Sequence, residues 1–248
     1  MCNLYSYMRS RAEAATLGRA LRDLNHNAPP TKGIYPDYSA PVIVKAANGE
    51  RIMRDLRWGL PSSSQALYMV AKKRADGQRA KGNDVDFAEL LKLEPDRGTT
   101  NVRNTTSKHW IRWLGPESRC LVPLTSFAEP DQVGATDKPN QNVWFALDES
   151  RPVAFFAGVH VCEWTSVRKS KVGPEVADLF GFLTTDTTDP VSRYHVKASP
   201  VILTTEEERE LWMGDAPWDE VRALQRPLPA GTLKVVAIGP RQDDTAPL

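Results

Sequence analysis

The second residue of the chain is a cysteine, and its position suggests chemistry. The sequence begins MCNLYSY, so removal of the initiator Met1 would make Cys2 the first residue. Cys2 would then carry a free α-amine, with a reference pKa of about 7.7–8.0, beside a thiol with a reference pKa of about 8.5. An aldehyde could form a Schiff base with this amine, and the thiol could then close a thiazolidine ring. The alternative is that Cys2 occurs by chance and has no function.

Two further residues have the types and contexts expected of proton-transfer groups. Glu129 ends the apolar run RCLVPLTSFAE, where desolvation would raise the pKa of a carboxyl group and suit it to acid–base work. His195, in SRYHVKASPV, precedes another apolar run and has a side chain that titrates near neutral pH. Both could equally be structural, because glutamates at strand ends and lone histidines are common.

A third group of residues is suited to binding nucleic acid. The segment NVRNTTSKHW places Asn101 and Arg103 two positions apart, so on a strand both would face one ligand. A guanidinium group offers phosphate two parallel hydrogen bonds. In LRWGLP, Trp58 follows Arg57 and could stack on a nucleobase. The alternatives are a polar strand edge for the first pair and a core position for Trp58.

Standard signatures of other chemistry are absent. The sequence contains no P-loop, no dinucleotide-binding glycine motif, no zinc-protease helix motif and no serine-hydrolase elbow. His160 and Cys162 in VHVC would share one face of a strand, but two ligands without a partner pair make a poor zinc site. We interpret them as part of a packed strand edge, and we expect neither a metal nor another cofactor.

Composition narrows the class of protein. The chain has 248 residues, 41% hydrophobic and 25% charged, and a formal net charge of +1. That length can bury a substantial core, and that charge argues against a histone-like coating of nucleic acid while allowing a local basic groove. Three scattered cysteines are too few for a disulfide scaffold, and no apolar run is long enough to span a membrane. We therefore expect a soluble, cytoplasmic protein.

The candidate residues must be positioned by many short strands and fewer helices. Runs rich in β-branched and aromatic residues predict strands at 41–45, 51–58, 119–124, 143–147, 153–161, 180–184, 201–203 and 233–238. Apolar spacing predicts helices at 12–24, 85–93, 206–213 and 218–225. Because strands and helices do not alternate regularly, a doubly wound parallel sheet is disfavoured. We expect a single α+β domain around a curved, mostly antiparallel, barrel-like sheet with flanking helices.

Two segments are expected to lack regular structure. Residues 25–38 are rich in Pro, Gly and Asn, which is typical of a loop. Residues 71–82, AKKRADGQRAKG, contain five basic residues and one acid, and we interpret them as a solvated, mobile loop. Such a loop could help to collect a polyanion if it lay beside a site.

Taken together, these segments resemble the SOS response-associated peptidase (SRAP) family. The resemblance extends almost from end to end, through MCNLYS, YPDYSAP, RWGLP, NVRNTTS, RCLVP, WFAL, FAGV, FGFLTT and a His-x-Lys before SPVILT. Each motif alone is weak, whereas their order and spacing make the joint match specific. The resemblance implies an SRAP-like domain over residues 1–240, from which Met1 is removed, and a C-terminal tail over residues 241–248.

The resemblance also implies an activity and its catalytic residues. Similar proteins link an N-terminal cysteine covalently to the ring-opened aldehyde of an abasic site in single-stranded DNA, after autocatalytic removal of the initiator methionine. Carried over by position, Cys2 would be the nucleophile, and Asn101 would position the open-chain sugar or the amine. Glu129 would move protons during attack and ring closure, and His195 would exchange a proton with the sugar oxygen.

The same resemblance implies a set of DNA contacts. Arg103 and Lys197 would hold the phosphates that flank the lesion, and Trp58, with Arg57 beside it, would pack on a neighbouring base or sugar. The partner is single-stranded DNA that contains abasic sites, and we expect the protein to act as a monomer. Many relatives open with Cys-Gly-Arg, whereas this chain has Asn3 and Leu4 after Cys2, so a phosphate-binding arginine is missing there.

Two other classes of function remain open at this point. A cysteine peptidase or amidohydrolase could use Cys2 and His195 on another substrate. A non-catalytic single-strand binder could use Arg103, Lys197 and Trp58, and its binding would be sensitive to salt.

Overall fold

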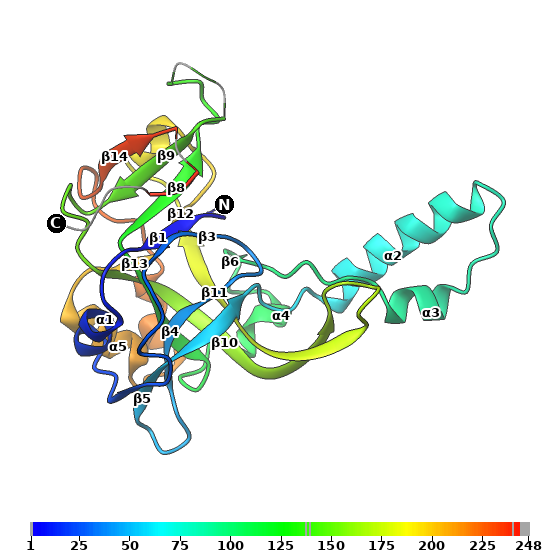
Figure 1. The fold of residues 1–248 in the computed structure, drawn as a ribbon, viewed down its shortest axis with the longest axis horizontal. Coiled ribbons are helices and arrows are strands. Elements are labelled where there is room, and N and C mark those ends of the chain that lie inside the picture. The colour runs from blue at the N-terminus through cyan, green and yellow to red at the C-terminus, as the bar shows by residue number, and fades with distance from the viewer. Residues whose placement is uncertain (1, 137, 139, 240, 244–248) are drawn as a thin grey trace.

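The apolar runs of the sequence close into a five-stranded barrel in the computed structural model, which describes residues 2–136, 138, 140–239 and 241–243. The barrel strands are β11 (Pro174–Thr185), β10 (Ala154–Val167), β7 (Arg119–Leu124), β4 (Ser39–Lys45) and β5 (Arg51–Trp58), in that spatial order. Neighbours along this order are antiparallel, and the barrel closes where β5 runs parallel to β11 at the pairs Arg57–Leu179 and Trp58–Phe180 (Figure 1).

A second sheet lies against one end of this barrel. Its strands, in spatial order, are β14 (Lys234–Ile238), β9 (Asn142–Ala146), β8 (Ser126–Pro130), β1 (Tyr5–Tyr7) and β3 (Thr31–Ile34). Four short strands extend the barrel sheet, namely β2 (Arg22–Asp23), β6 (Asn101–Val102), β12 (Ser199–Pro200) and β13 (Ile202–Leu203). The first strand of the chain therefore belongs to the second sheet, beside β8.

The helices surround the sheets and do not alternate with the strands. They are α1 (Arg11–Leu17), α2 (Ser64–Arg79), α3 (Phe87–Lys92), α4 (Lys108–Ile111), α5 (Glu206–Met213) and α6 (Trp218–Val221), with 3₁₀ turns at Val191–Arg193 and Arg222–Leu224. Helix α5 covers the outer face of the barrel, where the Trp212 indole N–H donates to the carbonyls of Cys120 and Gly158. Strand β10 is consequently buried on both faces from Ala154 to His160.

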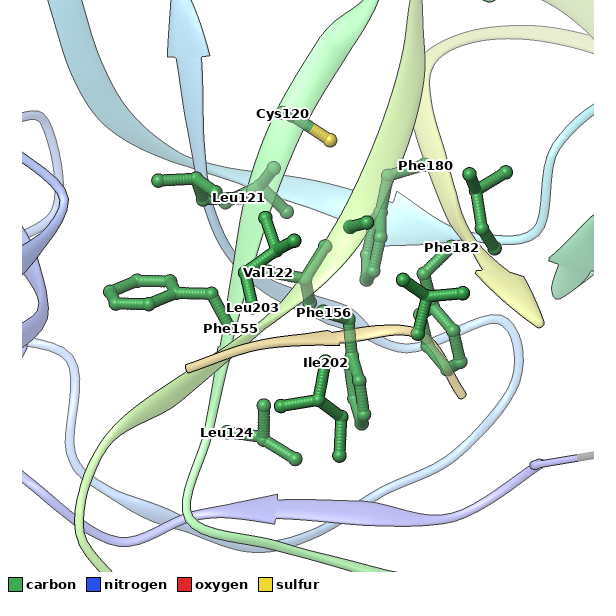
Figure 2. Packing of buried hydrophobic residues seen from close by; sticks show 14 of the residues in the cluster. Cys120, Leu121, Val122, Leu124, Phe155, Phe156, Phe180, Phe182, Ile202 and Leu203 are labelled. Atoms are coloured by element: carbon green, nitrogen blue, oxygen red, sulfur yellow. The ribbon is translucent and has the colours of Figure 1, made fainter. Parts of the chain in front are cut away.

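Aromatic side chains fill the barrel and join it to the second sheet. Phe156 and Phe182 stack with ring centroids 4.2 Å apart, and they lie side by side in Figure 2. Tyr5 of β1 meets Phe156 and Trp58 edge-on, at centroid distances of 5.4 and 5.1 Å. Edge-to-face pairs of this kind add to the stability gained by burial. Tyr5 therefore anchors the N-terminal strand to the core of the barrel.

The expected fold class is confirmed: one α+β domain whose sheets are mostly antiparallel and whose core is a barrel. The parallel exceptions among the described residues are the pairings of β5 with β11, β6 with β11 and β2 with β5. No helix of the described residues is long and apolar enough to cross a membrane.

The interpretation of residues 71–82 as a loop is wrong. Helix α2 runs through most of that segment, and it begins after Ser63, whose hydroxyl accepts from the Ala66 N–H. The segment is rich in Ala, Lys and Arg, which have high helix propensity, and Ala71 and Ala75 lie buried one turn apart. The sequence of a helix that buries so narrow an apolar face is easily mistaken for that of a solvated loop.

Two other boundaries differ from expectation. The helix predicted over 12–24 ends at Leu17, because Gly18 caps it and Leu21 and Leu24 lie exposed. The loop predicted over 25–38 contains strand β3.

The C-terminal boundary expected at residue 240 does not mark the end of packing. Asp243 is fully buried, accepts from the Ser126 hydroxyl at 2.6 Å, and forms an ion pair with Arg151 at 2.8 Å. Met1 and residues 244–248 lie outside the described residues.

Candidate active site

The pairing of β1 with β8 brings the N-terminus beside Glu129. Tyr5 pairs with Phe127 in an antiparallel register, and the Ala128 N–H donates to the Leu4 carbonyl at 2.9 Å. The residues before Tyr5 therefore run beside those that follow Phe127, and Cys2 lies near enough to Glu129 for the Glu129 charge to act on its thiol. Cys2 is fully buried there, with its Sγ 3.5 Å from the Leu4 carbonyl oxygen. The sheet therefore positions the thiol next to the carboxyl group.

Asn101 reaches the same place from the barrel. It lies on β6, opposite Phe182 of β11, and its Nδ2 donates to the Cys2 carbonyl oxygen at 2.7 Å. Nδ2 also donates to the Thr100 hydroxyl at 2.6 Å. Its Oδ1 is buried and has no hydrogen-bond partner among the described residues. Asn101 therefore fixes the backbone of Cys2 and leaves an acceptor free for a donor that enters the site.

His195 is placed by the turn that precedes it. Its backbone N–H donates to the Val191 carbonyl at 2.8 Å, and the Gln132 N–H donates to the neighbouring Tyr194 carbonyl at 2.8 Å. Nδ1 lies 3.1 Å from the Ala198 carbonyl oxygen, which can only accept, so Nδ1 carries the proton. Nε2 then faces Glu129, 3.7 Å from its Oε2. The two proton-transfer candidates are thus neighbours.

Burial sets the protonation of all three titratable groups. Burial raises the pKa of Glu129 to about 8, so this carboxyl group holds a proton at neutral pH. Burial raises the pKa of the Cys2 thiol well above its usual value, and the nearby Glu129 charge adds to the effect. Burial also lowers the pKa of His195, which is therefore neutral. With the carboxylic acid, the thiol and the imidazole all uncharged, protons can pass between these groups inside the buried site.

The pKa of Glu129 makes folding stability depend on pH. Below about pH 4.5 the group is protonated in both states; between pH 4.5 and pH 8 the unfolded chain ionises and the folded protein does not, so wild-type stability falls. We expect Glu129→Gln to remove this loss and to raise the free energy of unfolding at pH 8 by on the order of 3 kcal/mol relative to wild type. Urea titrations from pH 4 to pH 9 measure it.

Glu220→Gln, at an exposed position on α6, is the control and should follow the wild-type curve. Wild type and Glu129→Gln curves that run parallel over the whole range would show that Glu129 ionises normally in the folded protein.

A pocket of about 560 Å³ is lined by sequence neighbours of these residues, whereas Cys2, Asn101, Glu129 and His195 themselves are buried and do not line it. Ala128 and Pro130, which flank Glu129, form part of its wall, together with Asn3 and Leu4 next to Cys2. Lys197, predicted to bind phosphate, lines this pocket. A strand of DNA entering the pocket would therefore meet a cation beside the candidate active site.

Arg241 lines the same pocket and sequence reasoning missed it, because the segment after residue 240 was assigned to a tail. The chain returns to the pocket because Asp243 is anchored in the second sheet, where its backbone N–H donates to the Lys32 carbonyl at 2.9 Å. The buried pairing of Asp243 with Arg151, in the connection between β9 and β10, is not visible in a single sequence.

The other predicted DNA contacts lie in different environments. Trp58 is fully buried, and its indole N–H donates to the Thr100 carbonyl at 3.1 Å. A ring without exposed surface cannot stack on a base in this conformation, and the structure places Trp58 in the core. Arg57 is held by Asp37 at 2.6 Å and by Glu175 at 2.7 Å.

Arg103 departs from what a simple strand would give, whereas His160 and Cys162 of VHVC lie on one strand with their side chains in contact. Strand β6 ends at Val102, so strand alternation does not carry Arg103 to the face of Asn101. Arg103 is exposed and pairs with Asp186 at 2.5 Å. On β10, His160 is buried, and its Nδ1 lies 3.6 Å from the Sγ of the exposed Cys162.

Comparison with solved structures finds the same fold in bacterial proteins. A protein from Bacteroides thetaiotaomicron matches with a TM-score of 0.65 and 19% identity over 94% of this chain and 90% of its own. A protein from Bordetella bronchiseptica matches with a TM-score of 0.60 and 20% identity over 94% of this chain and 97% of its own. A phage-related protein from Bordetella bronchiseptica gives 0.56 and 18%, over 90% and 87%.

Comparison with curated proteins returns no match. A family model described as SOS response associated peptidase (SRAP) matches residues 1–242, which is nearly the whole chain and includes every candidate site residue. The chain belongs to the SRAP family.

Proposed function

We propose that this protein links itself covalently to abasic sites in single-stranded DNA through Cys2, after removal of Met1. One observation carries the proposal: four segments far apart in the sequence bring Cys2, Asn101, Glu129 and His195 together. Their contacts are the Asn101 bond to the Cys2 carbonyl, the approach of His195 to Glu129, and the effect of the Glu129 charge on the Cys2 thiol. The SRAP assignment supports a peptidase-like step that exposes the amine.

The chemistry requires an aldehyde and the two nucleophiles of one residue. The neutral α-amine of Cys2 adds to the aldehyde carbon of the open-chain sugar, and the hemiaminal loses water as its oxygen takes a proton from Glu129. The Cys2 thiol then adds to the iminium carbon and gives its proton to the Glu129 carboxylate. The net reaction joins aldehyde and aminothiol into a thiazolidine and releases one water. Because both nucleophiles belong to one residue, ring closure occurs at high effective concentration.

The neighbouring residues have supporting roles in this scheme. His195, neutral and in contact with Glu129, exchanges a proton with the sugar oxygen when the closed hemiacetal opens. Asn101 holds the backbone of Cys2 so that this residue stays near Glu129, and its free Oδ1 accepts from the amine or a sugar hydroxyl. Lys197 and Arg241 bind phosphates at the pocket rim. Arg103 contacts the strand farther out, and the protein acts as a monomer.

The test is a single-stranded oligonucleotide that carries one abasic site. We expect incubation to give a protein–DNA band that survives denaturing electrophoresis, and intact mass to show a chain shorter by one methionine. An oligonucleotide with a reduced abasic site, which has no aldehyde, is the matched control and should give no band. Protein that has lost Met1 but gives no band with the aldehyde substrate would rule out this activity and leave a peptidase acting on other substrates.

A further inference from the structure

A helical arm projects from the barrel next to the candidate active site. Helices α2 and α3 form it, and Figure 1 shows them extending away from the sheets. The arm leaves the barrel after Trp58 and returns just before Asn101, and its root is closed by Leu60 and Thr99, which exchange backbone hydrogen bonds of 2.9 and 2.7 Å. Arg168 clamps this root by donating to the Gly59 and Asp96 carbonyls at 2.6 and 3.0 Å.

Packing makes the arm an ordered unit. Arg74 of α2 forms an ion pair at 3.0 Å with Glu94, whose side chain is 1% exposed. Tyr68 of α2 meets Phe87 of α3 edge-on, with ring centroids 5.3 Å apart. These contacts use one side of α2 and leave its other side open.

That open side of α2 forms the floor of a groove of about 580 Å³. Ala66, Met69, Val70 and Lys73 line it, at the spacing that places residues on one helix face. Met69 and Val70 are 59% and 53% exposed, so the groove leaves apolar surface open to water. Arg97, on the segment that returns to the barrel, lines the opposite side. An apolar floor between two cations matches a ligand with flat apolar faces and negative charges.

We propose that this groove, between α2 and Arg97, binds nucleotides of the same DNA strand that flank the abasic site. Bases would lie on the side chains of Met69 and Val70, since a methionine sulfur makes favourable contacts with aromatic rings. Phosphates would pair with Lys73 and Arg97. The charge of the segment from the middle of α2 onwards agrees, because residues 71–82 carry five basic side chains and one acidic one.

The position of the groove favours DNA over an acidic peptide as its occupant. Arg97 precedes Asn101 by four residues, and four residues of extended chain span at most about 14 Å. The rim of the groove therefore lies within a few nucleotides of the point where a strand would be held at Cys2. A strand bound covalently at the active site would reach the groove without a second binding event. This inference rests on the proposed function, which supplies the strand.

The experiment separates binding from chemistry. Fluorescence anisotropy measures the affinity of the full-length protein for reduced abasic oligonucleotides, either short or extended on the 5′ or the 3′ side. We expect wild type to bind one of the extended strands about 10-fold more tightly than the short one, as burial of one base against Met69 and Val70 would give. Lys73→Glu combined with Arg97→Glu should abolish that gain. Lys72→Glu combined with Arg79→Glu, the matched change on the other side of α2, should retain most of it.

Crosslinking to a short aldehyde substrate, measured on the same proteins, distinguishes the two proposals. A groove variant that crosslinks the short strand at the wild-type rate but loses the gain from length supports the groove. If only wild type binds the extended strand more tightly, and neither wild type nor the groove variant crosslinks the short strand, the groove proposal is supported and the active-site proposal is refuted. Equal length dependence in wild type and the groove variant overturns the groove proposal. So does a groove variant that binds DNA normally and loses only its affinity for poly-glutamate.

Discussion

Cys2→Ala should abolish the adduct with an abasic oligonucleotide, lowering the yield on a denaturing gel at least about 100-fold. Alanine keeps the α-amine and removes the sulfur, so an imine can form but cannot be trapped by ring closure. An imine hydrolyses under denaturing conditions, whereas the thiazolidine persists. Because Cys2 is a small residue that lies before β1, outside any strand, the change should leave the fold and DNA affinity close to wild type. A DNA affinity close to that of wild type would show that Cys2 acts in the reaction and not in binding the strand.

Adding a reductant tests whether Cys2→Ala still forms the imine. Treating the Cys2→Ala reaction with borohydride should restore a stable band, since reduction converts the imine to an amine. Cys2→Ser, which is nearly isosteric, should behave in the same way. Adduct yield that is unchanged in Cys2→Ala without reductant would mean that another residue forms the bond, and the account of the site would then be wrong.

Trp58→Ala should produce the largest loss of stability of any change near the site, about 3–5 kcal/mol in the free energy of unfolding. The ring is fully buried and contacts Tyr5 and Phe182, at centroid distances of 5.1 and 5.3 Å, and alanine would leave a cavity where it lies. Since Tyr5 anchors β1, the cavity should also loosen Cys2 and slow crosslinking. Urea denaturation measures the first effect and the oligonucleotide gel the second.

Trp58→Phe is the matched control, and it should recover a large part of the stability because an aromatic ring still fills the space. The competing interpretation, in which Trp58 stacks on a base, predicts a different result. It predicts that Trp58→Ala weakens DNA binding and leaves the urea midpoint in place. Those two measurements therefore decide between a core residue and a DNA contact.

The fold class was accessible from sequence because apolar strand runs are a local signal. Closure of the barrel was not, since the parallel pairing of Arg57 with Leu179 joins residues far apart in the chain. The arm was missed for the opposite reason. Its main helix buries little besides Ala71 and Ala75, so the apolar periodicity that identifies helices is weak there.

The sequence identified single residues of the candidate site but not how they are arranged in space. Cys2 and Glu129 attract attention by position and context, but only the folded structure, in which β1 pairs with β8, shows that they are neighbours. The protonated state of Glu129 could be expected from its apolar flank and follows from its burial. Arg241 could not be found, because its role depends on how Asp243 ties the chain back to the sheet.

The wide spacing of the site along the chain affects how the protein is made. Cys2 leaves the ribosome long before its neighbours on β6, on β8 and after the Val191–Arg193 turn, which are synthesised much later. During translation the nascent chain therefore presents a cysteine terminus without its acid and imidazole, and the pocket is complete only when the last strands fold back. Under the proposed chemistry, the enzyme stays inactive towards cellular aldehydes until its synthesis is nearly finished.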